Sequence, residues 1–541
     1  MAAAITLFNY FSKQNLQQDI AGGITAAIIA LPLALAFGVS SGVGAIAGVY
    51  GAIFVGFFAA IFGGTRTQIS GPTGPLTIVM SVVFTEMIAK HPDTGIALAF
   101  TSVIIAGIFQ ILFGFAKLGK YFVMVPYPVI SGFMTGIGVI IILLQLAPLV
   151  GSVSFGSSFE TLINLPHIFN DISVTSLVFG LATLLLMTIW PSKWNKILPS
   201  SLFLLVLTTV LSALYFSNAQ LPNIGEIPSA LPQFHLPSFS LDVLQDVVYF
   251  GFLIAILGAI DSLLTSLVAD AMTGTQHDSN KELIGQGLGN AIAGFFHALP
   301  GAGATMRTTV NIRAGGQSAF SGVTHSLVLL IVVLWAGQYA QYIPHAVLAG
   351  ILIKVGIDII DWQYFARLKH MPIFSTALMI LVLSLTVFVD LITAVLVGMF
   401  VANLITIERI SNVEIDNIVF RRGDNLIGKK NKTLSRTLIF EVDGPVSFAV
   451  SRELSRRFSD IHDFDILLID LSRARIIGTT CAVMIIDMIE SNQKAGKEVI
   501  VVLGDEQVNK TLGLLSLNEL IPKNQQYKES VRAIEDLQNR C

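Results

Sequence analysis

Charged residues are scarce in this sequence. Only 12% of its 541 residues are Asp, Glu, Lys or Arg, whereas soluble domains carry about 25%. Hydrophobic residues make up 53% of the chain and the mean hydropathy is +0.75, so we expect most of the chain to lie in lipid. A basic tract with interleaved aromatic residues is also lacking, and no nucleic-acid partner is expected.

Cysteines and enzyme motifs are nearly or wholly absent. The two cysteines, Cys481 and Cys541, cannot form the disulfide framework of a small secreted domain, and we interpret Cys481 as a buried free thiol. The first twenty residues lack a charged region followed by a cleavage site, which predicts a mature cytoplasmic N-terminus. HExxH, GxSxG and P-loop motifs are missing, so the chain is not expected to be an enzyme.

Long apolar runs are what the sequence has in abundance. A helix of about 20 apolar residues spans the hydrocarbon core of a bilayer. Candidate spans are 21–39, 43–63, 95–116, 122–150, 173–190, 199–216, 247–269, 282–299, 318–337, 343–359, 373–389 and 391–408. Two shorter helices, 73–88 and 305–314, bring the total to about fourteen. The expected fold class is therefore an α-helical polytopic membrane protein.

Lysine and arginine are distributed unevenly between the loops. The polar loops 151–172 and 217–246 contain neither residue, so we place them outside. Most of the remaining basic residues then fall in the cytoplasm, as the positive-inside rule requires, with Lys90 as the exception. We expect a multi-pass protein of the cell membrane, in contact with lipid, with both termini in the cytoplasm.

Two interrupted stretches differ from the other apolar runs. Pro300–Arg313, PGAGATMRTTVNIR, combines small residues with threonines and Arg307, and Ser70–Thr77, SGPTGPLT, has a proline suited to a first helical turn. We predict that each is an extended segment leading into a helix N-terminus, whose N–H groups and dipole attract an anion. Paired broken helices indicate the central site of a transporter, although either stretch alone is also compatible with a packing kink.

Asp261 lies deep in an apolar span, where an unpaired carboxylate costs several kcal/mol. Thr265 lies one turn further on the same helix face, and such oxygen atoms suit a small cation. The alternative is a protonated Asp261 that is hydrogen-bonded between helices. Arg307 either raises the positive potential for an anion or pairs with a carboxylate, and both readings stay open. We interpret Asp270, Asp358, Asp361 and the polar run 280–290 as interfacial, capping or packing residues.

The composition changes at Arg409. We predict a cytoplasmic N-terminus at 1–20, a transmembrane domain at 21–408, a polar solvated linker at 409–434 and a small α/β domain at 435–541. In the last of these, the β-rich runs TLIFEV, DILLIDL and EVIVVLG alternate with helical patterns. This alternation predicts a layered domain built on one sheet.

Five motifs of the chain, in order, resemble those of the SulP family of inorganic-anion transporters. They are GGITAAIIALPLALAFG, GGTRTQISGPTGPLTIVM, GAIDSLLTSLVAD, NKELIGQGLGN and GAGATMRTTVNIRAGG. With the STAS-like C-terminal domain, the resemblance covers nearly the whole chain, and within the family it is closest to the BicA-type sodium-dependent bicarbonate transporters. The resemblance implies fourteen spans in two inverted seven-span repeats, a core domain that moves against a gate domain, a cytoplasmic STAS domain and a homodimer.

The resemblance also implies site residues. Sodium would lie near Asp261, Thr265, Gly303 and Thr305, and the anion would lie between Thr73 and the Ala304–Thr305 turn beside Arg307. Two departures bear on the substrate. Arg307 stands where BicA-type sequences tend to have a small residue, and Leu33, after Pro32, lacks the glutamine of many sulfate-type members. Gly478 and Thr479 replace the Asp-Ser pair of phospho-switched STAS domains, so dimer contact or binding of a cytoplasmic regulator is the expected role of this domain.

These residues bear on four candidate functions. The first is a secondary transporter that takes up bicarbonate, or a similar small oxyanion, with sodium as the coupling ion. The second is proton-coupled symport of sulfate or a dicarboxylate, with Asp261 as the proton carrier. The third is an uncoupled anion exchanger or channel, which the permanent charge of Arg307 would suit. The fourth, a signalling scaffold with STAS as its output, does not explain the paired anion-site motifs.

Overall fold

The structure is a computed structural model of the chain. It describes residues 15–122, 124–152, 157–168, 172–191, 199–216, 221–225, 232–237, 243–423, 436–459 and 463–539, with Tyr10, Trp194 and Ile461. The chain forms two compact units, Met1–Met399 and Phe400–Cys541. Much of the predicted linker, the orientation-setting Lys193 and Lys196, and Cys541 lie outside the described residues.

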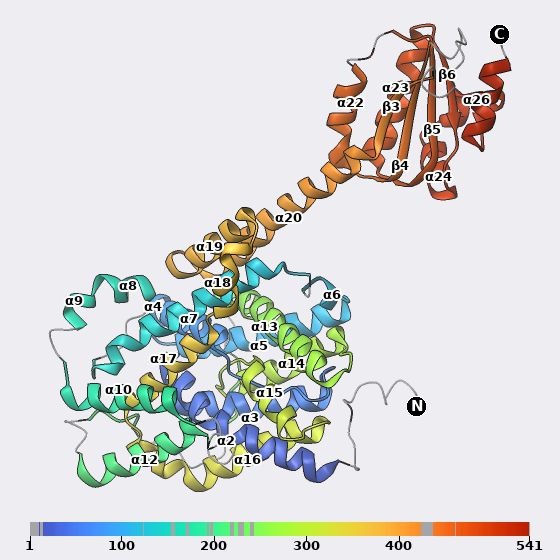
Figure 1. Cartoon of the computed structure of the whole chain (residues 1–541). Coiled ribbons are helices and arrows are strands. Elements are labelled where there is room, and N and C mark those ends of the chain that lie inside the picture. The colour runs from blue at the N-terminus through green and yellow to red at the C-terminus, as the bar shows by residue number, and fades with distance from the viewer. Residues whose placement is uncertain are drawn as a thin grey trace. The chain divides into compact units, whose positions relative to one another are not determined.

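The described part of the first unit is mainly helical, as predicted (Figure 1). Its first half contains α2 (Leu16–Ser40), α3 (Ala45–Phe62), α4 (Gly74–Lys90), α5 (Gly95–Phe115), α7 (Tyr127–Leu149), α10 (Val174–Ile189) and α12 (Ser200–Tyr215). The second half contains α13 (Leu244–Thr273), α14 (Ser279–Phe295), α15 (Thr305–Arg313), α16 (Ala319–Ala336), α17 (His345–Ile359), α19 (Ile373–Phe388) and the start of α20 (Leu391–Asp416). These fourteen helices match the fourteen predicted segments. Among the described residues, seven helices are long and apolar enough to cross a membrane unaided.

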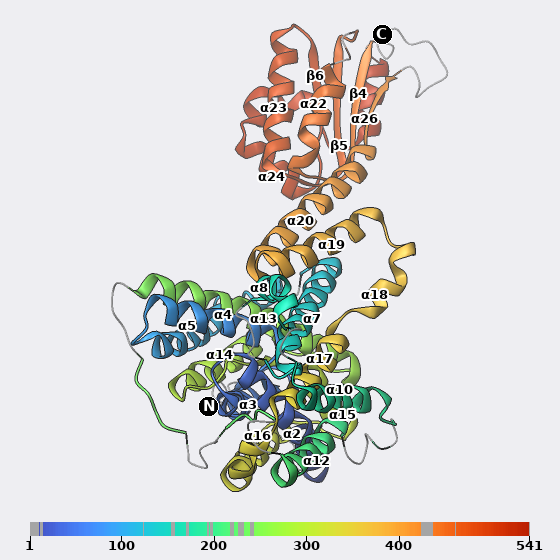
Figure 2. The same ribbon diagram turned by 90° about the vertical axis from the view of Figure 1, so that its left-hand side faces the viewer.

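Each half repeats the same order of elements. The third helix of each half, α4 or α15, is preceded by a two-residue strand, β1 (Ser70–Gly71) or β2 (Ala302–Gly303). The helices pack as two groups: α2, α3, α4, α5, α13, α14, α15 and α16 form one, and α7, α10, α12, α17 and α19 form the other. Figure 2 shows α2, α3 and α16 side by side, away from α19. Two inverted seven-segment repeats therefore build a core-like and a gate-like bundle.

Small residues let the helices of the larger group approach closely. A Cβ atom at Gly107 of α5 would lie 2.4 Å from the carbonyl oxygen of Gly287 on α14, and one at Gly287 would lie 2.5 Å from that of Gly107. Without a hydrophobic driving force between helices in lipid, such contact depends on close packing of small residues. Gly287 therefore fixes α14 against α5, while Gly289 of the same helix packs against Val55 of α3.

Short helices connect the spans in the first unit. They are α6 (Gly119–Phe122), α8 (Ser158–Ile163), α9 (Leu165–Ile168), α18 (Trp362–Arg367) and the 3₁₀ turns η2 (Gly337–Tyr342) and η3 (Leu368–His370). Asp361 accepts a hydrogen bond from the backbone N–H of Tyr364 at 3.0 Å and so caps α18. This is the structural role expected for Asp361.

The second unit has a five-stranded sheet of order β3-β4-β5-β6-β7. Its strands are β3 (Ile418–Arg422), β4 (Thr437–Val446), β5 (Ile466–Ile477), β6 (Glu498–Val502) and β7 (Gln526–Tyr527). β3 runs antiparallel to β4, and the other pairs are parallel. Helices α22 (Ser451–Ser459), α23 (Thr479–Lys494) and α24 (Glu506–Leu514) cover one face, and α26 (Ser530–Asn539) covers the other. The one-sheet α/β prediction is confirmed.

The predicted linker differs from the structure in one respect. Helix α20 continues through Arg409 to Asp416, and residues 418–422 form strand β3 of the sheet. Polar composition suggested a solvated linker, but polar residues are also normal on the exposed part of a long helix and on an edge strand. Cys481 is buried and is a free cysteine, as predicted.

Candidate functional site

The two interrupted stretches meet in the structure. β1 and β2 pair antiparallel, with Ser70 opposite Gly303 and Gly71 opposite Ala302. α4 begins directly after Thr73, which has extended backbone as its N-cap, and α15 begins after Ala304, its N-cap. Two helix N-termini, each with a positive dipole end, therefore start from one short ladder. Breaks more than 200 residues apart in the sequence build one site.

One polar face of α13 holds the interrupted stretch Pro300–Arg313 in place. The Ser262 hydroxyl accepts a hydrogen bond from the Gly303 N–H at 3.1 Å, and the Thr265 hydroxyl lies 2.9 Å from the Gly303 carbonyl oxygen. Thr265 Oγ1 is also 2.8 Å from Thr305 Oγ1. The structure thus brings together Thr265, Gly303 and Thr305, three of the residues predicted for a cation.

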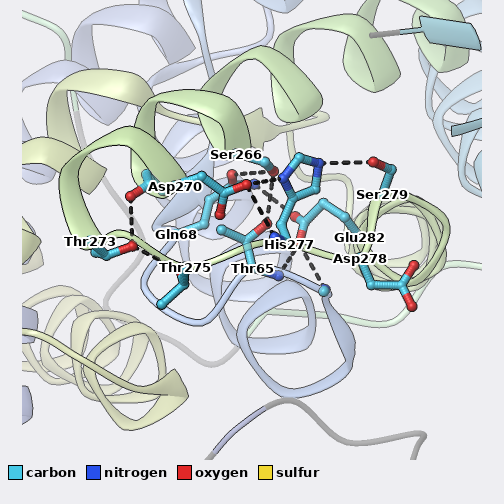
Figure 3. A network of polar contacts seen from close by, with 12 residues as sticks. Thr65, Gln68, Ser266, Asp270, Thr273, Thr275, His277, Asp278, Ser279 and Glu282 are labelled. Carbon is cyan, nitrogen blue, oxygen red and sulfur yellow. Dashed lines mark hydrogen bonds and ion pairs between the residues drawn. The ribbon is translucent and has the colours of Figure 1, made fainter. Parts of the chain in front are cut away.

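Glu282 of α14 anchors the segment that leads into Ser70–Thr77 (Figure 3). Its carboxylate, in a residue 1% exposed, accepts hydrogen bonds from the N–H groups of Gly64 and Thr65, both at 2.8 Å. Its other oxygen accepts from Gln68 Nε2 at 2.7 Å and Gln286 Nε2 at 2.8 Å. A buried charge needs such complete pairing. The sequence reading missed this role, because it explained the polar run at 280–290 by capping and packing.

Two further amides of α14 brace the strands. Gln286 Nε2 donates to Ser70 Oγ at 2.6 Å. Asn290 makes two hydrogen bonds with Gly301, accepting from its N–H at 2.7 Å and donating to its carbonyl at 2.9 Å. The residues recur at 282, 286 and 290, and this i, i+4 spacing on one helix face was the signal that could have revealed them.

Asp261 faces the meeting point of the half-helices. The Thr73 hydroxyl lies next to the Asp261 carboxylate, and Arg307 acts on that carboxylate electrostatically. Within the described residues, neither Thr73 Oγ1 nor Asp261 Oδ2 has a hydrogen-bond partner of good geometry, although both atoms are buried. Buried polar atoms without partners are rare in folded proteins. Two such atoms close together are expected where a bound ion supplies the missing contacts.

Arg307 lies between the two broken stretches. The side chain is 2% exposed, and its Nη2 donates to the carbonyl oxygen of Pro72, next to Thr73. Its Nη1 is buried without a partner in the described part of the chain. The guanidinium therefore joins the two broken stretches, interacts with Asp261 and adds positive potential between the half-helices.

The backbone N–H groups of Gly303 and Ala304 are not free to bind an anion. Gly303 donates its N–H to Ser262, and Ala304 donates its N–H to the Ile69 carbonyl at 2.9 Å. Both amides are therefore engaged in holding the ladder. The N–H groups that can face an anion are those of the first turn of α15, where Thr305 is exposed, while Ala304 is 8% exposed.

Asp270 has a separate role near the end of α13. His277 Nδ1 lies 2.6 Å from Asp270 Oδ2, and Ser279 Oγ lies 2.9 Å from His277 Nε2 (Figure 3). These contacts fix the short turn between α13 and α14. The interfacial structural role expected for Asp270 agrees with this geometry.

Comparisons with known proteins extend these observations. The sulfate permease family model matches residues 16–384, and the STAS domain model matches residues 429–533. A "Bicarbonate transporter BicA" from Synechocystis sp. is 44% identical over 532 residues, which cover 97% of this chain and 94% of that protein.

Two solved structures agree with the fold. The transmembrane domain of a cyanobacterial bicarbonate transporter BicA superposes with a TM-score of 0.68 at 50% identity, covering 72% of this chain and 100% of that chain. The overall structure of SLC26A9 superposes with a TM-score of 0.85 at 19% identity, covering 100% of this chain and 94% of that one. At that identity the second match supports the fold alone.

Proposed function

Because this chain belongs to the sulfate permease family, it is a membrane transporter of a small inorganic anion and not an enzyme, and we propose that it takes up bicarbonate together with sodium. The identity of 44% to a bicarbonate transporter over nearly the full length supports bicarbonate as the anion. The site geometry supports a cation partner.

One observation carries the proposal: the buried Asp261 Oδ2, which has no hydrogen-bond partner among the described residues, lies beside two helix N-termini. Sodium prefers oxygen ligands, and Asp261, Thr265, Thr305 and the Gly303 carbonyl offer them within one small region. The anion would bind between Thr73 and the first turn of α15, where helix dipoles and Arg307 favour negative charge. Positive and negative ligands would then occupy adjacent positions.

Coupling follows from electrostatics in this arrangement. Without sodium, the Asp261 carboxylate repels an incoming anion at short range. Bound sodium neutralises that charge, so each ligand strengthens the binding of the other by the same factor. With both ligands bound, the core-like bundle would move past the gate-like bundle with sodium and bicarbonate, whose charges cancel.

Flux measurements test this proposal directly. Proteoliposomes containing the full-length protein should accumulate labelled bicarbonate when a sodium gradient is imposed, and much less without one. Asp261→Asn keeps the shape but removes the charge, and should abolish stimulation by sodium while the protein stays folded. Asp270→Asn is the matched control and should retain this stimulation, because Asp270 is near the end of α13 and contacts His277 of the α13–α14 turn. Sodium stimulation that persists in Asp261→Asn would refute the cation site.

Arg307 favours a second candidate function. Its buried guanidinium already interacts with Asp261, and a permanent cation can partly replace sodium in neutralising that carboxylate. The alternative is therefore sodium-independent exchange of bicarbonate or sulfate. Labelled sulfate uptake without sodium, unaffected in Asp261→Asn, would favour this alternative.

We further propose the cell membrane as the location, with both termini in the cytoplasm. The loops 151–172 and 217–246 contain no Lys or Arg, which supports an outer position for them.

A homodimer and binding of a cytoplasmic regulator to the STAS domain are also proposed. We propose that the two copies meet along one face of α20, formed by Leu396, Phe400, Leu404 and Ile407, which are 52%, 65%, 51% and 38% exposed.

A further inference from the structure

His325 is a buried histidine to which the proposed transport gives no role. It lies on α16 and is 0% exposed, and neither of its ring nitrogens has a hydrogen-bond partner within the described residues. A neutral imidazole has one N–H donor and one acceptor nitrogen, and leaving both without partners inside a protein is unfavourable. An apolar residue at this position would avoid that penalty, so the imidazole calls for a separate role.

Arg307 of α15 is the charged group that acts on His325. The interaction is electrostatic, and Arg307 Nη1 is likewise buried without a partner in the described part of the chain. A direct contact brings the two helices together, because Asn311 Nδ2 donates to Ser321 Oγ at 2.8 Å. Arg307 lies one turn before Asn311 on α15, and His325 lies one turn after Ser321 on α16. Two incomplete polar groups therefore lie near each other.

Two glycines border the region between these groups. A Cβ atom at Gly56 of α3 would lie 3.3 Å from His325 Nδ1 and 3.1 Å from the Ser70 carbonyl oxygen. A Cβ atom at Gly71 would lie 2.7 Å from Arg307 Nη1. Because Gly71 directly follows Ser70 in β1, the imidazole nitrogen, the guanidinium nitrogen and the carbonyl oxygen all face one short stretch of backbone that carries no bulky side chain.

The charge state of His325 decides how it can act. A protonated imidazole would place a second positive charge beside the guanidinium, whereas a neutral imidazole offers an acceptor nitrogen. Polar groups that face one another without a direct hydrogen bond are commonly joined by a buried water, which needs two to four polar partners. We propose that His325 is a positioning residue for Arg307, and that one water binds His325, Arg307 Nη1 and the Ser70 carbonyl oxygen.

This contact fixes the second arm of the guanidinium. Arg307 Nη2 already donates to the Pro72 carbonyl, next to Thr73. With Nη1 held from the side of α16, the positive charge stays between the two half-helix N-termini. A charge that is held in place binds an anion more tightly than a mobile one, because less conformational freedom is lost on binding. The effect of His325 on anion binding rests on the proposed function, whereas its contact with Arg307 does not.

A double-mutant cycle tests the contact without any ligand. Tm values would be measured for the detergent-solubilised full-length wild type, His325→Leu, Arg307→Ser and the double variant. We expect His325→Leu to lower the Tm by about 2 °C in the wild-type background, and by less than half as much in Arg307→Ser. A core histidine with no role predicts the opposite, because leucine removes a buried polar group. Equal shifts in the two backgrounds, or a raised Tm in His325→Leu, would overturn the proposal.

Ser131→Ala is the matched control for this cycle. Ser131 is also buried with a hydroxyl that has no partner among the described residues, but it lies on α7, in the gate-like bundle. Its Tm shift should be the same with Arg307 and with Arg307→Ser. If Ser131→Ala depended on Arg307 as strongly as His325→Leu does, the coupling would not be specific to His325 and the proposal would fall.

Uptake kinetics test what the contact does. In proteoliposomes, the KM for bicarbonate should rise about three- to tenfold in His325→Leu, the effect of weakening one hydrogen bond to a charged group, while the maximal rate stays within about twofold. His325→Gln should keep the KM near that of wild type, because its amide offers both a donor and an acceptor. An unchanged KM in His325→Leu, or an equal rise in His325→Gln, would reject the positioning role.

The two proposals fail in different ways. If wild-type uptake proved independent of sodium or bicarbonate, the proposed function would fall, and the ligand-free Tm cycle would still decide for or against the contact. If the cycle showed no coupling between His325 and Arg307, the positioning role would fall and sodium-coupled uptake would stand.

Discussion

The carboxylate of Glu282 accepts hydrogen bonds from four N–H groups. Each of its two oxygens accepts from two N–H groups, an arrangement that favours the ionised form. The carboxylate holds the segment before β1 through Gly64, Thr65 and Gln68. Residues of α14 that touch no proposed ligand therefore decide where the proposed anion-binding residue Thr73 lies.

Glu282→Gln tests this anchoring. Glutamine places an NH₂ group against two of the four donors, and hydrogen bonds to a charged group are worth about 1.5–3 kcal/mol each. We expect the free energy of unfolding to fall by roughly 2 kcal/mol or more, seen as a lower Tm of the detergent-solubilised protein. Glu86→Gln is the control, because Glu86 is 47% exposed and pairs only loosely with Lys90. Equal Tm values for the two variants would contradict the anchoring role.

Cys481 gives a residue-scale prediction in the second unit. Burial, and to a smaller extent the Glu414 carboxylate, raise the pKa of the Cys481 thiol to about 11. At pH 8 roughly one molecule in a thousand then carries the reactive thiolate. We expect iodoacetamide to modify Cys481 only after denaturation at pH 8, with native reactivity appearing as the pH approaches 11. Mass spectrometry would measure the modification of Cys481, and rapid modification in the native protein at pH 8 would contradict this prediction.

At the scale of elements, the contact between α5 and α14 tolerates no added atoms. Gly107→Ala would place a Cβ atom 2.3 Å from the Ala291 nitrogen, and overpacking of this kind costs about 1–3 kcal/mol. We expect lower thermal stability and, since α14 carries Glu282 and Asn290, weaker bicarbonate uptake. Gly513→Ala in α24 meets nothing closer than 3.6 Å and should behave as wild type. A Gly107→Ala protein of unchanged stability and activity would refute this reading.

Elements were predictable from sequence where one segment decides its own structure. Hydrophobic length placed twelve of the fourteen helices, and Pro75 indicated the first turn of α4. The contacts that join segments could not be read in this way. Nothing local to Glu282 shows that Gly64 and Thr65 donate to it, and nothing near Arg307 names the Pro72 carbonyl. The extension of α20 to Asp416 was missed because polarity marks exposure rather than the end of a helix.

At the scale of the whole molecule, the exposed stripe on α20 concerns assembly. Leu396, Phe400, Leu404 and Ile407 recur every three or four residues, so they share one helix face. If the proposed homodimer forms along this face, Leu404→Cys should crosslink two copies in the membrane under mild oxidation, once Cys481 and Cys541 are replaced. Ile331→Cys, on α16 and 63% exposed, should not. Absence of a crosslink at every position of the stripe would rule out this face.

The two-residue pairing of β1 with β2 also has a consequence for biosynthesis. Ser70 leaves the ribosome long before Gly303, its ladder partner, so the first half of the protein must wait in the membrane with that strand unpaired. Contacts between residues so distant in the chain form slowly. Substitutions near Gly303 would therefore also disturb β1, although that strand was synthesised and inserted earlier. Two halves of the protein that are produced separately should restore the site when they meet in one bilayer.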